Sequence, residues 1–339
     1  NMKYQPPYTI TSKIIHLIAQ ISENIGRLAV LEEIHDSLKL RKANRIRTIQ
    51  GSLAIEGNTL STEQITAILN GKTVIAPPKE VQEVRNAIKA YEAFQQWQPC
   101  QEKDLLQAHQ ILMTGLIDEV GQYRHGGVGV MSGDRVVHMA PPANQINRLM
   151  ADLLDWLNDA EIHPLIQSSV FHYEFEFIHP FADGNDRMGR LWQTLILSRW
   201  NPIFANIPVE SLIYQNQKAY YEALQASTDR TDSAPFIEFI LQMILDAILS
   251  STNTAQASDQ ATAQADVHAH LEMSEQVQRL ISAMKQEDYT LAELMQLVGL
   301  THRATFQKNY LNPAIEAGLI KRTIPDKPKS PKQKYRLKI

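Results

Sequence analysis

The sequence predicts an all-α protein, a mainly helical fold with one small β-hairpin, followed by a small α+β domain of the winged helix-turn-helix type. Apolar residues recur at helical spacing along most of the chain, strand-like runs are few, and the composition changes after a polar stretch that ends near residue 266. With 339 residues, 44% of them hydrophobic, the chain is long enough for two or three domains with a substantial core.

We expect four parts along the chain. A helical region over 1–100 precedes a helical core over 101–250, and a domain over 271–339 ends the sequence. Between them, 251–270 is expected to be a linker, because the run STNTAQASDQATAQAD at 251–266 is polar and poor in large apolar groups. Such a composition is typical of an exposed linker or a frayed helix.

The first informative element is a helix over about 45–57. Ser52 and Glu56 stand four residues apart, so they share one helical face, and Gly57 is a suitable stop for the helix. A new helix is expected to begin at Ser61, because Gln64 three residues later completes a capping box.

A β-hairpin is predicted next. Val128, Gly129 and Val130 are followed by Ser-Gly-Asp and then by the β-branched run at 135–138, which is a hairpin signal. A helical period then returns over 146–157.

The segment 179–190, His-Pro-Phe-Ala-Asp-Gly-Asn-Asp-Arg-Met-Gly-Arg, carries the chemistry. Apolar helical patterns flank it, so it lies on a loop that opens a helix, where free N–H groups and the helix dipole favour an anion. Arg187 and Arg190 share one helical face. If they are buried they need anionic partners, and few carboxylates lie nearby in the sequence. The segment therefore predicts a phosphate site with a built-in base; the alternative is a loop whose polar groups are satisfied locally.

This segment resembles the signature of the Fic family, His-Pro-Phe-x-Asp-Gly-Asn-Gly-Arg-x-x-Arg. Every specified position matches except one, where the chain has Asp186 in place of glycine. The resemblance covers roughly residues 45–250. It implies an enzyme, a protein adenylyltransferase that moves AMP from ATP onto a hydroxyl side chain of a target protein.

The resemblance also implies roles for single residues. His179 would be the general base, a role that suits a side chain titrating near neutral pH. Asp183 would hold Mg²⁺, a hard cation that prefers oxygen ligands. Nucleotide binding, with guanidinium forks suited to phosphate oxygens, is implied for Gly184, Asn185, Asp186, Arg187 and Arg190.

Asp186 leaves several alternatives open. Aspartate tolerates left-handed backbone geometry, so the turn can survive, but its charge lies beside the expected triphosphate. The side chain would point outward, contact the metal, or weaken ATP binding. Doc kinases, a related branch, have lysine here and transfer a different group, so phosphotransfer is one alternative. A regulator that senses nucleotide with a degenerate Fic core is another.

The upstream residues resemble the inhibitory motif of the same family, (Ser/Thr)-x-x-x-Glu-(Gly/Asn). The resemblance implies that Glu56, one helical turn after Ser52, pairs with Arg190 and occupies the space that the γ-phosphate needs. Because this glutamate orients a water molecule in some relatives, removal of AMP is a further alternative.

Two other segments resemble functional parts of Fic proteins. The hairpin around Val128, Gly129 and Val130 would be a flap that registers the target chain by main-chain pairing, the alternative being a structural ribbon. Asn216 and Tyr220 lie on one helical face in a segment that resembles a nucleotide contact, with Tyr221 and Leu224 in the core. The alternative is that these aromatic residues simply pack inward.

The C-terminal part resembles a winged helix-turn-helix. Thr290 and Glu293 form a capping box, Gly299 breaks the helix, and strands are expected over 319–323 and 335–338. From residue 301 onward there are ten lysines and arginines against two acids, a net charge of +8, which leaves −12 for the rest because the whole chain carries −4. This asymmetry predicts DNA contact, or else a solvated tail or a protein-binding domain.

Composition sets the remaining expectations. A single cysteine, Cys100, excludes an intramolecular disulfide framework, and no stretch of about twenty apolar residues is free of charge. We therefore expect a cytoplasmic protein that makes no membrane contact. The expected partner is a target protein that the sequence does not identify, and the resemblance implies self-modification and a homodimer as further expectations.

Overall fold

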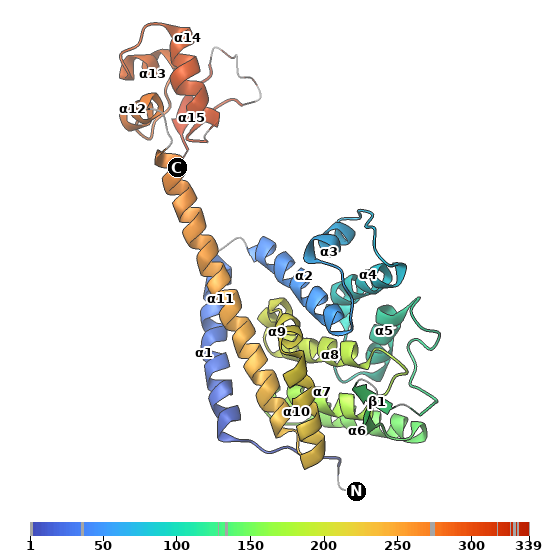
Figure 1. Ribbon diagram of the computed structural model, residues 1–339. Helices are drawn as coiled ribbons and strands as arrows, with labels where there is room; N and C mark the ends of the chain where they lie inside the picture. The colour runs from blue at the N-terminus through green and yellow to red at the C-terminus, as the bar shows by residue number, and fades with distance from the viewer. Residues whose placement is uncertain are drawn as a thin grey trace. The chain divides into compact units, whose positions relative to one another are not determined.

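The computed structural model describes residues 3–34, 37–127, 129–132, 135–271, 275–316, 318–325, 327, 330 and 332–338. The chain divides into two compact units, Asn1–Gln256 and Ala257–Ile339. Helices dominate both units, as Figure 1 shows, and each unit carries a two-stranded antiparallel sheet. The prediction of a mainly helical fold is confirmed.

The first unit is a helical bundle. Its helices are α1 (Ser12–Ile34), α2 (Ser37–Ile55), α3 (Thr62–Leu69), α4 (Pro78–Ala93), η1 (Phe94–Gln96), α5 (Glu102–Met113), η2 (Ala143–Gln145), α6 (Ile146–Asp159), α7 (Pro164–Ile178), α8 (Asn185–Trp200), η3 (Pro202–Asn206), α9 (Val209–Gln215), α10 (Gln217–Arg230) and the part of α11 (Ala234–Leu271) up to Gln256. The predicted hairpin is formed by β1 (Gly129–Ser132) and β2 (Arg135–Met139).

Helices α7 and α8 form the centre of this unit and lie side by side (Figure 1). Both are buried nearly all round, with Phe171 and Phe175 from α7 and Trp192 and Leu195 from α8 inaccessible to solvent. A helix that is apolar on every side needs a cover of other helices. The loop between these two helices therefore starts and ends on rigid, fully packed elements.

Helix α2 packs closely against α9. At Gly51 an added Cβ would lie 2.6 Å from the backbone nitrogen of Ser211 in α9, so only glycine permits the close crossing. The Ser211 hydroxyl donates to the Arg47 carbonyl at 2.9 Å. These contacts fix the end of α2 against the core.

Two predicted helix boundaries are confirmed. After α2, Gly57 has a φ of +89°, and the N–H groups of Gly57 and Asn58 bond back to the Ala54 and Leu53 carbonyls, which is a Schellman motif. Before α3, Ser61 and Gln64 form the complete capping box.

Helix α11 includes the predicted linker over 251–270, which continues as helix to Leu271, and the boundary between the two compact units falls within this segment, after Gln256. The segment is rich in alanine and glutamine, which favour helix. Within the part of the chain that the structure describes, one stretch, Ala234–Thr254, is long and apolar enough to cross a membrane. Since 61% of its apolar window is buried inside the protein, it fits the pattern of a core helix.

The second unit contains short helices and a small sheet. The helices are α12 (Glu275–Ala283), α13 (Leu291–Leu297), α14 (Arg303–Phe306), the π-helical turn η4 (Gln307–Leu311) and α15 (Asn312–Glu316). Strand β3 (Ile320–Arg322) pairs with β4 (Tyr335–Leu337), and both lie within the predicted strand segments. The capping box of Thr290 and Glu293 is present, and Leu280, Leu294 and Phe306 are fully buried in a core of their own.

Candidate active site

The site begins at a strained residue at the end of α7. His179 adopts left-handed geometry, with φ 52° and ψ 61°, while its N–H still bonds to the Phe175 carbonyl at 2.9 Å. For a residue that is not glycine this conformation costs about 1–2 kcal/mol. The buried Arg124 holds it in place, because its Nε donates to the His179 carbonyl at 2.7 Å and its Nη2 to the Ile178 carbonyl at 3.3 Å.

The loop that follows is held by Asn185. Its Oδ1 accepts from the Phe181 N–H and its Nδ2 donates to the Phe181 carbonyl, both at 2.9 Å. Gly184, with a φ of +83°, leads into α8. Asn185 therefore holds the shape of the turn, with both polar atoms of its amide hydrogen-bonded to the loop backbone.

His109 of α5 packs against the same loop. Its ring stacks on Phe181 at a centroid distance of 3.7 Å and an interplanar angle of 4°. Its Nδ1 accepts from the Gly121 N–H, so its Nε2 carries the proton and donates to the Asp183 carbonyl at 3.0 Å. Burial lowers the pKa of His109 to about 4, so the ring is neutral.

Replacing Asn185 by alanine is expected to destabilise the fold by about 1–3 kcal/mol, because two buried backbone groups of Phe181 lose their partner. Urea unfolding measures this loss. The matched control is Asn158→Ala at an exposed position of α6, which we expect to change the free energy of unfolding by less than about 0.5 kcal/mol. Equal effects from the two variants would contradict the role given to Asn185.

The buried arginines have partners that the sequence analysis missed. Arg187 faces Glu83 of α4, with Nη1 and Oε1 3.9 Å apart, and Asp183, with Nη2 and Oδ1 3.6 Å apart. Glu83 also accepts a hydrogen bond from Asn58 at 2.8 Å. The premise that few carboxylates are available to these arginines is wrong, because Asp183 lies one turn away and tertiary packing adds Glu83 and Glu56 from earlier helices or turns. Phosphate binding by the two arginines stays a prediction.

Arg190 has the partner that the family resemblance implies. Its Nη2 donates to Glu56 Oε1 at 2.8 Å and to the Ser52 carbonyl at 3.1 Å, and its Nε donates to Ser52 Oγ at 3.3 Å. The side chain is almost fully buried, and Nη1 has no hydrogen-bond partner within the described residues. The Nε of Arg187 is likewise buried without a partner there. Two buried donors in the first two turns of α8 thus remain available for an anionic ligand.

Asp186 is accommodated by a second carboxyl group. Its side chain is hydrogen-bonded to Glu176 of α7, and the guanidinium of Arg190 adds positive charge nearby. Burial, followed by the charge of Asp186, raises the pKa of Glu176 well above its usual value, so Glu176 is the protonated donor. For Asp186 burial acts to raise the pKa, but the Glu176 hydrogen bond and the positive charge outweigh it and lower the pKa overall. Of the three alternatives left open for Asp186, an outward-pointing side chain does not agree with this buried position, and the other two stay predictions.

A Glu176→Gln variant is expected to change the pH dependence of stability. Glutamine keeps a donor toward Asp186 but does not titrate. Because the pKa of Glu176 is raised in the folded state, its contribution is fully present below about pH 4.5 and is lost as pH rises toward the folded pKa. Asp186, whose folded pKa is lowered, is ionised in both states above pH 4.5, so it adds no slope there.

The free energy of unfolding of the variant, relative to wild type, should therefore rise as the pH increases above about 4.5, by up to about 1.4 kcal/mol per pH unit, until the pH reaches the raised pKa of Glu176. Urea titrations at several pH values measure this difference. A difference that does not change with pH would contradict the assignment of the proton to Glu176.

Tyr220 requires a correction. Its ring is fully buried between His172 and Phe236, and its hydroxyl lies 3.2 Å from His172 Nε2. It therefore packs in the core and has no surface for a nucleotide. Tyr221, expected in the core, is 39% exposed, and its pKa is raised to about 12 by burial first and then by the charge of Asp186. The prediction therefore placed the wrong one of these two adjacent tyrosines on the buried face of α10.

The remaining predicted residues lie at the edges of the site. Asn216 is exposed, and its Nδ2 donates to the Leu212 carbonyl at 2.9 Å. In the flap, Gly129 pairs with Met139 and Val130 with His138, while Val128 lies outside the described residues. The contacts predicted for these residues with nucleotide or target chain stay predictions.

Comparison with known proteins agrees with this geometry. The family model described as Fic/DOC family matches residues 99–197, and the model described as filamentation induced by cAMP protein Fic-like, C-terminal domain, matches residues 275–338. A crystal structure of a Fic family protein from Desulfovibrio desulfuricans G20 is 52% identical, with a TM-score of 0.72, over 99% of this chain and 98% of that one. The chain belongs to the Fic family.

Curated relatives are more distant. The protein adenylyltransferase Fic of Nematostella vectensis is 31% identical over 234 residues, which cover 64% of this chain and 52% of the relative. The protein of the same name from Culex quinquefasciatus is 31% identical over 216 residues, 60% of this chain and 40% of the relative. The chain thus spans about half or less of the length of these adenylyltransferases.

Proposed function

We propose that this protein is an adenylyltransferase that moves AMP from ATP onto a hydroxyl group of a protein. The observation that carries the proposal is that the short loop from His179 leads directly into α8, whose buried Arg187 and Arg190 keep an Nε and an Nη1 donor without a partner within the described residues. The hydroxyl oxygen would attack the α-phosphorus, the bond to the β-phosphate would break, and pyrophosphate would leave. The hydroxyl proton would pass to His179.

The loop and α8 would hold the phosphates. Arg187 and Arg190 supply guanidinium donors, and the first N–H groups of α8 follow Gly184. A rigid loop suits this chemistry, because phosphoryl-type transfer depends mainly on positioning and charge neutralisation. The Asn185 and His109 contacts with the loop backbone provide that rigidity.

Asp183 would hold Mg²⁺ together with phosphate oxygens. Its side chain is 56% exposed beside Arg187, so its carboxylate is accessible to solvent. Within the described residues no group of three or more potential ligands could hold a metal ion by itself. A single carboxylate fits Mg²⁺ bound mainly through substrate phosphates and water. The ion would neutralise phosphate charge.

Glu56 would restrain the reaction. Its ion pair with Arg190 engages the guanidinium that would otherwise bind the γ-phosphate. The pair is buried on the arginine side, so ATP must displace it before it can bind productively. The cytoplasmic location, the target protein, self-modification, a homodimer and DNA contact by the basic second unit all stay predictions.

The position of the label in ATP tests the chemistry directly. We expect protein to be labelled by ATP that carries the isotope in its α-phosphate and not by ATP labelled in its γ-phosphate. Label from the γ-phosphate alone would contradict adenylyl transfer and would instead support phosphotransfer, one of the alternatives that Asp186 raises.

A further inference from the structure

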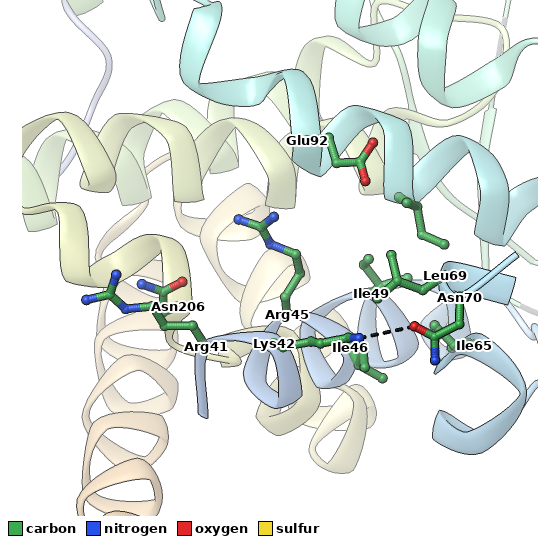
Figure 2. A pocket seen from close by; sticks show the side chains of 11 residues that line it. Arg41, Lys42, Arg45, Ile46, Ile49, Ile65, Leu69, Asn70, Glu92 and Asn206 are labelled. Carbon is green, nitrogen blue, oxygen red and sulfur yellow. Dashed lines mark hydrogen bonds between the residues drawn. The ribbon is translucent and has the colours of Figure 1, made fainter. Parts of the chain in front are cut away.

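A separate pocket lies on the same inhibitory helix. It has a volume of about 410 Å³ and is formed by α2, α3, α4 and η3 (Figure 2). This volume is within the range of about 300–1,000 Å³ typical of small-molecule sites. None of its lining residues belongs to the candidate active site.

The two ends of the pocket differ in chemistry. Figure 2 shows apolar side chains gathered at one end, whereas Arg41 and Asn206 lie at the other and Arg45 stands between them. The apolar end contains Ile49, Ile65 and Leu69, and Ile88 also lines the pocket. A ligand that fits this arrangement has a hydrocarbon part and a polar head.

The charge of the head group follows from the cations. Arg45 and Lys42 line the pocket, and within the described residues neither pairs with a carboxylate. Lys42 Nζ donates to the neutral Asn70 Oδ1 at 3.1 Å. Glu92 lines the opposite wall, so a second anionic group on the ligand would be repelled there.

We propose that this pocket binds a small amphipathic anion, a short acyl or alkyl chain with a single carboxylate or phosphate head. The head would pair with Arg45, and the chain would lie against Ile49, Ile65 and Leu69. Charge-assisted hydrogen bonds to a guanidinium and burial of the chain would both favour binding.

The pocket is connected to the active site through α2. Arg45, Ile49 and Ser52 follow one another at spacings of four and three residues on one face of α2, and Glu56, four residues after Ser52, is the first residue beyond the end of that helix. These four positions extend over about 16 Å. The pocket exists in the state in which Glu56 pairs with Arg190, so a ligand that fits it stabilises that state and inhibits transfer. This regulatory effect rests on the proposed function; ligand binding does not.

Isothermal titration of the full chain with decanoate tests the site without using ATP. We expect saturable binding, weakened at least about tenfold by Arg45→Gln and by replacing the probe with uncharged decanol. Arg47→Gln, on the same helix but outside the pocket, should leave affinity unchanged. Decyl phosphate, titrated in parallel, shows which head group is preferred. The proposal is supported whichever of the two anions binds more tightly.

Absence of saturable binding, or equal loss in the two arginine variants, would overturn it. A dimer that dissociates on Arg45→Gln, without binding decanoate, would assign the pocket to a second copy of the chain and would also overturn it.

In a separate assay, bound decanoate should lower adenylyl labelling by wild type about 5- to 150-fold and leave labelling by Glu56→Gly unchanged. Decanoate that binds but leaves wild-type labelling unchanged would refute the inhibitory coupling.

Discussion

Replacing Glu56 by glycine is expected to raise the rate of adenylyl transfer by about 10- to 100-fold, a range typical of coupling between two sites. The change removes the carboxylate that pairs with Arg190 and frees the guanidinium for the γ-phosphate. Because Glu56 follows the last residue of α2, glycine there should cost little helix stability. The initial rate of labelling from α-labelled ATP measures the effect.

Two further variants at this position sharpen the interpretation. Glu56→Gln keeps the size and hydrogen-bonding capacity but removes the charge, so its rate should lie between those of wild type and Glu56→Gly. Glu63→Gln, on the exposed surface of α3, should behave as wild type. If Glu56→Gly and wild type transfer AMP at the same measurable rate, the ion pair is structural and not inhibitory.

Loss of His179 is expected to have the opposite and larger effect. His179→Ala, made in the Glu56→Gly protein, should lower the transfer rate by about 10²- to 10⁴-fold, the usual contribution of a general base. ATP affinity should change little, because the phosphate donors come from α8. Labelling kinetics and ATP titration together separate the two quantities.

The left-handed conformation at this position calls for a second variant. Asparagine tolerates this geometry better than alanine, so His179→Asn should keep the loop intact while lacking the base. His16→Ala, on the exposed side of α1, is the control that should retain activity. Transfer that survives both changes at position 179 would show that the base lies elsewhere.

The features that the sequence alone predicted are those encoded within a few residues. The turn at Gly184, the Gly57 stop and the two capping boxes depend on neighbours no more than five positions apart, and each has a strong local preference. The Glu56–Arg190 pair, 134 residues apart, was expected only because the sequence resembles a family in which such a pair occurs.

The partners that complete the site were not predictable in this way. His109, Arg124 and Glu83 lie 55 to 104 residues before the groups they contact, and each is an ordinary helix or loop residue in its own segment. Glu176 lies close in sequence to Asp186, but its burial and proton depend on the packing of α7 against α8.

The error at Tyr220 has a related cause. A helical period indicates that one face is buried but does not fix which of two adjacent aromatic residues faces the core. The choice depends on Phe236 and Phe239 of α11, against which Tyr220 packs. For 251–270 the sequence left a linker and a frayed helix open, because small polar residues are compatible with a helix as well as with a coil; the structure has a helix.

Intact mass after incubation with ATP and Mg²⁺ tests whether this site transfers adenylyl groups under the control of Glu56. The measurement compares wild type with Glu56→Gly, with ATP binding of both confirmed by titration. We expect the variant to gain the mass of an adenylyl group through self-modification, and wild type to gain much less in the same time. A gain of phosphate mass, or an unmodified variant that binds ATP, would contradict the mechanism proposed for His179 and Arg190.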